Sequence, residues 1–267
     1  MASFSVITNV AANNAQANLY STNIGLRQAL TRVSSGFRIN SSGDDAAGLA
    51  VANSYRSTVA VLNQGVRNAN DGLSDLQIKD GALDNMSKLI DRLATLATQA
   101  ASGHTTNASR TTLQAEFADV LSEINREAGV AKLDVANGFS VFVSSDGANG
   151  VVGGSVNAVT TTSLGIAASN ISTQSGAATA VAALSTAVST LGTVQGQVGT
   201  IQNRLSYAIS LAQSQIVNNR AAESRIRDAN IAEESANLTR FSILNQSGIA
   251  ALAQANGQTS AVLSLLR

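Results

Sequence analysis

The stretch from Val33 to Leu49 reads VSSGFRINSSGDDAAGL and separates two segments of helical apolar periodicity. Its Gly, Ser and Asn residues favour turns and helix caps over the interior of a helix. Asp44 and Asp45 stand where a new helix would begin, because negative charge is favourable at the positive end of a helix dipole. The sequence therefore predicts a short helix, a structured joint and then a much longer helix.

The segment before this break carries one apolar stripe at helical spacing, formed by Leu19, Leu26, Leu30 and Val33. The same segment is rich in Asn and Gln, and Asn is a poor helix former on its own. We therefore expect these residues to become helical only when they pack against a partner.

The segment after the break carries a near-heptad apolar seam, with residues spaced mostly by three and four. Its members are Val59, Leu62, Val66, Ala69, Leu73, Leu76, Leu83, Met86, Ile90 and Leu93. Asp80 falls in the one slot that should be apolar. A helix from Asp44 to Ala100 would be about 85 Å long at 1.5 Å per residue, a length that suits a rod or filament better than a compact domain. Each of three glycines weakens it by roughly 1 kcal/mol, so partner packing must hold it: Gly65, Gly72 and Gly81.

The remainder of the chain predicts two further long helical regions around a β-rich insert. A short turn at His104 leads to a third helix that would fold back on the second, with one apolar face: Leu113, Phe117, Val120, Leu121, Ile124 and Ala128. Residues 137–176 are rich in Gly, Ser and Thr and predict a small hairpin plus surface loops, with Val151, Val152, Val156 and Val159 in another strand or two. Helix returns from Ala177 to Asn219, and a last helix from about Ala222 presents Leu238, Phe241, Leu252 and Leu263.

These elements predict an all-α dominated fold, a long antiparallel helical bundle with a small β-hairpin. We expect residues 1–43 and 222–267 to form one terminal domain and residues 44–221 to form the bundle, with the hairpin at about 137–176. The terminal helices are too weakly amphipathic to be stable alone. Their natural partners are each other, as a coiled coil, and the same helices in other copies. Head-to-tail contacts that do not close produce a helical filament.

The composition argues against several functional classes. Lys plus Arg and Asp plus Glu each number 17, so the basic excess of a nucleic-acid-binding protein is missing. No run approaches the roughly 18 apolar residues of a membrane span, so we expect no membrane insertion. The chain has no Cys, and its one His, His104, lacks the partners of a zinc site or a catalytic triad. We favour a charged helix start over metal binding for Asp44 and Asp45. The sequence thus predicts no catalytic, cofactor or metal site.

Two motifs at opposite ends of the chain resemble the signatures of bacterial flagellin. Near the N-terminus these are SSGFRIN at residues 34–40 and DDAAGLA at residues 44–50. Near the C-terminus they are AESRIRD at residues 222–228, AQAN at residues 253–256 and VLSLLR at residues 262–267. The resemblance covers roughly the first 130 and the last 90 residues. Phe37, where Leu is common in the family, is a mild departure.

The resemblance implies a structural subunit that polymerises into the flagellar filament, the extracellular propeller of swimming bacteria. It also implies four partners: further copies of the chain, an export chaperone for the C-terminal helix, the flagellar export apparatus and a filament cap. Residues 1–9 lack a secretory leader, which alone reads as cytoplasmic, whereas flagellins leave through a dedicated channel without a cleaved signal peptide. The alternative is the hook–filament junction protein, which shares the terminal helices. An enzyme carried on a filament would need an inserted catalytic domain.

A further resemblance concerns the segment from Arg92 to Gln99, which is similar to the flagellin segment bound by the flagellin-sensing Toll-like receptor of animals. Arg92, Leu96 and Gln99 lie on successive turns of the long helix, and Glu116 on the next helix matches the acidic residue of the family there. The same surface packs between subunits in the family. We expect subunit packing as its main use and receptor recognition as a second one.

Overall fold

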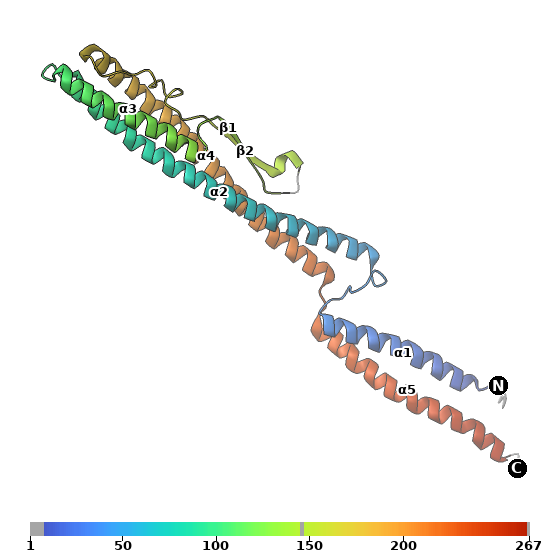
Figure 1. The fold of residues 1–267 in the computed structure, drawn as a ribbon. Helices are drawn as coiled ribbons and strands as arrows, with labels where there is room; N and C mark the ends of the chain where they lie inside the picture. The colour runs from blue at the N-terminus through green and yellow to red at the C-terminus, as the bar shows by residue number, and fades with distance from the viewer. Residues whose placement is uncertain (1–7, 145–146, 266–267) are drawn as a thin grey trace. The chain divides into compact units, whose positions relative to one another are not determined.

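The computed structural model describes residues 8–144 and 147–265, apart from the side chains of residue 148 and residues 258–265. The chain divides into two compact units. The terminal unit comprises Met1–Ser57 and Asn218–Arg267, and the bundle unit comprises Thr58–Val217. The helices are α1 (Val10–Ser35), α2 (Ala46–Ala101), α3 (Asn107–Val130), α4 (Gln174–Arg227) and α5 (Ile231–Leu265). Strands β1 (Asn137–Phe142) and β2 (Val151–Val156) flank a short 3-10 turn, η1 (Gly147–Gly150), and the predicted mainly helical fold is confirmed (Figure 1).

The bundle unit packs α3 and α4 along α2, and Figure 1 shows α3 running back beside α2. The predicted seam of α2 forms the core, where Leu76, Leu83 and Met86 are inaccessible to solvent. Phe117 of α3 and Leu184 of α4 are buried in the same cluster. Because these side chains are large and fully buried, the bundle unit carries a continuous apolar core of its own.

Helix α4 is long and apolar enough to cross a membrane when judged by length and composition alone. Core helices of water-exposed bundles meet the same criterion. Its apolar stripe, including Leu191, Val198 and Leu205, is buried in the core of the bundle unit. The arrangement therefore accounts for the hydropathy of α4 by packing between helices.

The polar residue in the α2 seam is Lys79, and the assignment of Asp80 to that slot is wrong. The Lys79 residue is 7% exposed, whereas Asp80 is exposed. A spacing of three from Leu76, followed by four to Leu83, places position 79 on the core face. The apolar stem of lysine can line such a seam while its ammonium group reaches outward. Here the ammonium nitrogen lies 3.0 Å from a carboxylate oxygen of Asp75, one turn earlier.

A buried arginine closes the turn between α2 and α3. Arg110 is 6% exposed, and its guanidinium donates to the carbonyl oxygens of Ala100 at 2.8 Å and Ser102 at 2.9 Å. It also donates to the side chain of Asn107 at 3.0 Å. The last carbonyls of a helix have no partner within the helix, and a cation is favourable at that end of the dipole. Arg110 thus satisfies both requirements for α2.

The β-hairpin lies against α2 and α4, and a glycine stands at each contact, Gly65 on α2 and Gly154 on β2. Its strands pair antiparallel, from Asn137 opposite Val156 to Phe142 opposite Val151. A Cβ atom at Gly65 of α2 would overlap the carbonyl oxygen of Val143. On the other side, a Cβ atom at Gly154 would lie 2.6 Å from Ile201 of α4. Glycines that weaken the helix in isolation therefore permit the hairpin to approach closely.

The insert forms the hairpin that we predicted, and its second strand does not include Val159. Val159 is not in a strand among the described residues; it is buried in a loop, where its backbone N–H donates to the carbonyl oxygen of Leu133 at 2.7 Å. Over so few residues, a valine buried in a loop gives the same sequence pattern as a valine in a strand. This is why the pattern also suggested a strand at Val159.

The last helix begins later than we predicted, at Ile231 instead of Ala222. Residues 222–227 contain no helix-breaking residue, and α4 continues through them to Arg227. The Asn230 side chain then accepts a hydrogen bond from the backbone N–H of Ala232 at 3.2 Å. Asparagine favours this position because its side chain can satisfy a free N–H of the first helical turn.

We expect Gly65→Ala to lower the free energy of unfolding of the bundle unit by about 1–3 kcal/mol, the usual cost of overpacking, because the added methyl group meets backbone of the hairpin. The matched control is Gly81→Ala on the same helix, where nothing lies within 4 Å of the added atom. The control should gain up to about 1 kcal/mol in helix propensity. Urea unfolding followed by far-UV circular dichroism measures both, and equal effects would contradict the close-approach explanation.

Candidate self-assembly site: the terminal helix pair

Helices α1 and α5 of the terminal unit lie side by side and run antiparallel (Figure 1). Leu19, Leu26 and Val33 are half-buried on α1, as are Leu238, Phe241 and Leu252 on α5. The most buried seam residues are small: Ala29 is 3% exposed and Ala255 is 8% exposed. The side chain of Leu263 lies outside the described residues. Small seam residues allow the two backbones to come close together.

One member of the predicted α1 stripe lies off this seam. Leu30 is 57% exposed, and the adjacent Ala29 takes the position that faces α5. The spacing from Leu26 to Ala29 to Val33 is three and then four, which is the coiled-coil spacing. The spacing from Leu26 to Leu30 to Val33 is equally helical, so spacing alone does not separate Leu30 from Ala29.

Two glycines on the terminal helices accept large side chains from the opposite helix. A Cβ atom at Gly25 of α1 would lie 2.6 Å from the ring of Phe241. A Cβ atom at Gly248 of α5 would lie 3.1 Å from Leu19. Each large side chain therefore packs over a position with no side chain, in the manner of a knob and a hole.

Polar contacts also join α1 and α5 among the residues that the structure describes. A guanidinium nitrogen of Arg32 lies 3.0 Å from a carboxylate oxygen of Glu234, and both side chains are largely buried. The amide of Asn245 donates to the side-chain oxygen of Asn23 at 2.8 Å. At the far end, the amide of Asn9, which also caps α1, donates to the carbonyl oxygen of Ala255 at 2.8 Å. The Nε atom of Arg32 is buried without a hydrogen-bond partner.

The connector from α1 to α2 pairs with the connector from α4 to α5. Phe37 and Asp228 form an antiparallel bridge. The backbone N–H of Arg38 donates to the carbonyl oxygen of Arg227 at 2.6 Å, and that of Ala229 donates to Gly36 at 2.9 Å. Gly36 ends α1 with a φ of 76°, a left-handed conformation that glycine adopts without strain. Two helix breaks, far apart in sequence, are therefore joined by backbone hydrogen bonds.

Side chains reinforce this pairing of connectors. The guanidinium of Arg227 lies over the ring of Phe37, 4.2 Å from its centroid, a cation–π geometry. The Arg38 guanidinium donates to the carbonyl oxygen of Ile226 at 2.8 Å, and Ile39 is 1% exposed. The departure to Phe at position 37 thus provides an aromatic surface for the arginine of the other connector.

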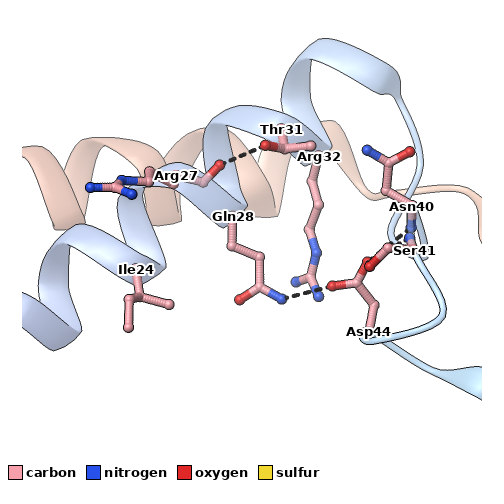
Figure 2. Close-up of a pocket in the computed structure, with 8 residues that line it drawn as sticks. All are labelled: Ile24, Arg27, Gln28, Thr31, Arg32, Asn40, Ser41 and Asp44. Atoms are coloured by element: carbon pink, nitrogen blue, oxygen red, sulfur yellow. Dashed lines mark hydrogen bonds between the residues drawn. The ribbon is translucent and has the colours of Figure 1, made fainter.

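A cavity of about 420 Å³ lies between α1 and the first connector (Figure 2). It is lined by Ile24, Arg27, Gln28, Thr31, Arg32, Asn40, Ser41 and Asp44. In Figure 2 the amide of Gln28 points at the carboxylate of Asp44, a contact of 3.3 Å. That carboxylate also accepts the backbone N–H groups of Asn40 at 3.1 Å and Ser41 at 2.9 Å, and the Ser41 hydroxyl at 3.1 Å. Four donors therefore hold Asp44 as a structural anchor of the loop.

The two adjacent aspartates have separate structural roles. Asp45 accepts the backbone N–H of Gly48 at 2.9 Å and so caps the start of α2, as its position predicted. The hydrogen bonds to Asp44, chiefly from the backbone of Ser41, lower the pKa of its carboxyl group. Among the residues that the structure describes, no group of three or more His, Cys, Asp or Glu side chains gathers.

Apolar side chains also lie on the solvent-exposed faces of the terminal pair. On α1, Tyr20 is 70% exposed and Ile24 is 50% exposed. On α5, Ile243 is 58% exposed and Ile249 is 56% exposed. These side chains do not serve the seam between α1 and α5. Their apolar surface is open to solvent in the single chain.

The segment that resembles the receptor-bound segment of flagellin lies on the bundle unit. The structure brings most of the residues named for it together there. Arg92 of α2 donates to Glu116 of α3 at 2.9 Å, and both side chains are about half exposed. Gln99 is exposed on α2. Leu96 lies in the helical interface below them and is 1% exposed. The accessible surface is therefore formed by Arg92, Gln99 and Glu116, without Leu96.

Comparison with known proteins decides the family. Residues 6–140 match the bacterial flagellin N-terminal helical region, and residues 178–266 match the C-terminal helical region. The chain belongs to the bacterial flagellin family. It is 32% identical to flagellin FlaB1 of Treponema pallidum and 34% identical to a flagellin of Halalkalibacterium halodurans. Each alignment covers 97% of this chain and 98% of the relative.

A filament core protein and a flagellin of known structure are also similar to the chain. The flagellar filament 33 kDa core protein of Treponema phagedenis is 34% identical, with 97% of this chain and 98% of the relative covered. A crystal structure of Bacillus cereus flagellin is 27% identical and superposes with a TM-score of 0.47, covering 59% of this chain and 94% of that one. The family assignment rests on the sequence matches at both ends.

Membership in the flagellin family fixes the general function. Flagellins are structural subunits of the bacterial flagellar filament, which is extracellular, and they are not enzymes. This chain is accordingly a filament subunit that assembles with further copies of itself. The relatives are flagellins and filament core proteins, and nothing among them favours the hook–filament junction alternative.

We expect the loop anchored by Asp44 to loosen in acid. A carboxyl group whose pKa is lower in the folded state stabilises that state above its unfolded pKa of about 3.9, and the stabilisation is lost as the pH falls through the lower folded value. Hydrogen exchange of the Asn40 and Ser41 amides, read by NMR, should show protection at neutral pH and its loss in that acidic range. In Asp44→Asn the pH dependence should disappear. Protection that persists unchanged in acid would contradict the assignment.

Proposed function

We propose that the terminal pair of α1 and α5 holds copies of this flagellin together in the filament. In this proposal residues 1–43 and 222–267 supply the inner tube, and residues 44–221 supply the outer wall. The main support is that α1 and α5 satisfy each other along one seam and still expose Tyr20, Ile24 and Ile243 on other faces. A seam within the subunit and apolar faces directed outward are what a helical polymer needs from its subunit.

The seam residues and the exposed residues then have different tasks. Leu19, Leu26, Val33, Leu238, Phe241 and Leu252 hold α1 to α5. Leu30, which is exposed and off the seam, is a candidate for contact with a neighbouring copy, as is Leu263 of the C-terminal segment. In this mechanism the filament is a passive mechanical element that converts rotation of the flagellar motor into thrust. Its stiffness comes from contacts between copies.

The experiment that tests this proposal is assembly of the full chain beside a version that lacks residues 1–35 and 231–267. This truncation removes α1 and α5 and keeps both connectors, including the Phe37–Asp228 bridge. Negative-stain electron microscopy with short filament seeds should show long filaments from the full chain and none from the truncated chain. Circular dichroism should show that the bundle unit remains folded. Filaments from the truncated chain would overturn the proposal.

We further propose that the subunit is secreted through the flagellar export apparatus and adds beneath a filament cap. The chain contains no Cys, so no disulfide has to be broken before an unfolded chain is threaded through a channel. The exposed apolar residues of α5, such as Ile243 and Ile249, would favour aggregation before assembly. An export chaperone that covers the C-terminal helix would prevent this association. Recovery of a chaperone complex with the full chain, lost on removal of residues 231–267, tests the assignment.

The bundle surface around Arg92 supports a second proposal, recognition by an animal Toll-like receptor for flagellin. The segment from Arg92 to Gln99 resembles the recognised segment, and Arg92, Gln99 and Glu116 are accessible together. Leu96 is unsuitable for a test because it is buried, and Leu96→Ala would destabilise the helical interface by about 2–5 kcal/mol.

We expect the Arg92→Ala, Gln99→Ala double variant, as soluble monomer, to reduce receptor signalling at least tenfold in reporter cells. The matched control is Glu123→Ala with Arg126→Ala, which removes another exposed ion pair from the same bundle. The control should signal like the unmodified chain, since an exposed ion pair contributes little to stability. Full signalling by the first variant would exclude the proposal, and loss in both would indicate a nonspecific effect.

A further inference from the structure

Apart from the two contacts at Gly25 and Gly248, the seam between α1 and α5 is poor in the features that fix the register of a coiled coil. Its α1 side repeats at spacings of three and four through a run of mostly small residues: Ala12, Ala15, Leu19, Thr22, Leu26, Ala29 and Val33. A shift of one heptad would again place small and apolar residues opposite one another. Away from those two glycines, apolar packing therefore discriminates weakly between registers of this pair.

We propose that two partly buried polar contacts, Asn23 with Asn245 and Arg32 with Glu234, determine the register in which α1 and α5 pair. Each contact joins one residue of α1 to one of α5, at 2.8 Å and 3.0 Å respectively. The Glu234 residue is 9% exposed, so its charge has little access to solvent as an alternative partner. A buried polar pair can set the register of a coiled coil because only one alignment satisfies both partners.

The sequence around these contacts shows what a shifted register would cost. A shift of seven residues moves Asn23 opposite Leu238 or Leu252, neither of which can accept or donate a hydrogen bond. The same shift in one direction brings Arg32 opposite Phe241 and leaves Glu234 without its partner. Buried donors and acceptors without partners are strongly unfavourable. The observed register is therefore favoured because the shifted registers leave polar groups without hydrogen-bond partners.

This inference deepens the proposed function and rests on it for its consequence in the filament. Copies in a helical polymer must present identical surfaces to one another. A slip of one heptad would displace the exposed faces of α5 relative to α1 by about 10 Å. Copies with different registers could not make the same contacts with their neighbours.

Spin-label distances measure the register directly. The chain has no Cys, so Ala17→Cys on α1 and Ala251→Cys on α5, both exposed positions, carry the only labels. Labelled subunits are measured by pulsed electron paramagnetic resonance as monomer, and in filaments diluted with excess unlabelled chain. The unmodified seam should give one distance. Replacing all four residues, as Asn23→Leu, Asn245→Leu, Arg32→Met and Glu234→Met, should add populations displaced along the axis by about 10 Å.

The matched control is Asn14→Leu with Gln246→Leu, which changes exposed polar residues of the same helices and should retain one distance. A single distance in the four-residue variant would overturn the inference, as would several distances in the unmodified seam. If the four-residue variant loses its terminal helices, exchanging the charges of Arg32 and Glu234 tests the inference instead. Arg32→Glu alone should broaden the distances, and adding Glu234→Arg should restore one distance, whereas equal broadening in both would overturn the inference.

Filament yield is recorded separately in each sample. Loss of filaments from the unmodified chain, with one distance retained, would contradict the proposed function and leave the register inference in place. Filaments from the unmodified chain, with no change of distance in either set of seam variants, would contradict the register inference and leave the proposed function in place.

Discussion

The structure of the terminal unit depends on the hydrogen bonds between its two connectors. Gly36 and Arg38 of the first connector pair with Ala229 and Arg227 of the second. Without this pairing, the break after α1 and the break after α4 would be two independent flexible points. With it, the end of α1 and the start of α5 are held close together. The cation–π contact of Arg227 with Phe37 adds a side-chain contact at the same position.

The chain contains two kinds of helix packing with different stability. In the bundle unit, large side chains such as Leu83, Met86 and Ile90 are fully buried, and each contributes roughly 1.5–3 kcal/mol by leaving water. In the terminal pair, the most buried seam residues are alanines, and the leucines are only half-buried. Helices in water gain most of their stability from packing. The terminal pair therefore has more to gain from neighbouring copies than the bundle has.

Heptad spacing was sufficient to predict α2, α3 and most of α4 from the sequence, because large apolar residues recur on one face of each. Heptad spacing failed at positions where a particular side-chain or backbone contact determines the structure. Residues 222–227 contain no helix breaker, and α4 continues through them to a break at Asp228, where the first connector pairs with it. Lys79 enters the α2 seam through its apolar stem, which a scale of residue polarity does not capture.

The candidate site was predictable only in part for a related reason. The leucine stripes predicted helices α1 and α5. They did not predict that Ala29 instead of Leu30 faces α5, because residue spacing does not give the distance between the helices. Asn23 and Arg32 are unremarkable in the sequence, because their partners lie more than 200 residues away. The role of several glycines was equally hidden in the sequence. Gly25, Gly65 and Gly248 each weaken a helix in isolation, and each is the position at which another part of the chain packs against it. A residue that reads as a defect in one helix is thus a requirement of the contact between two.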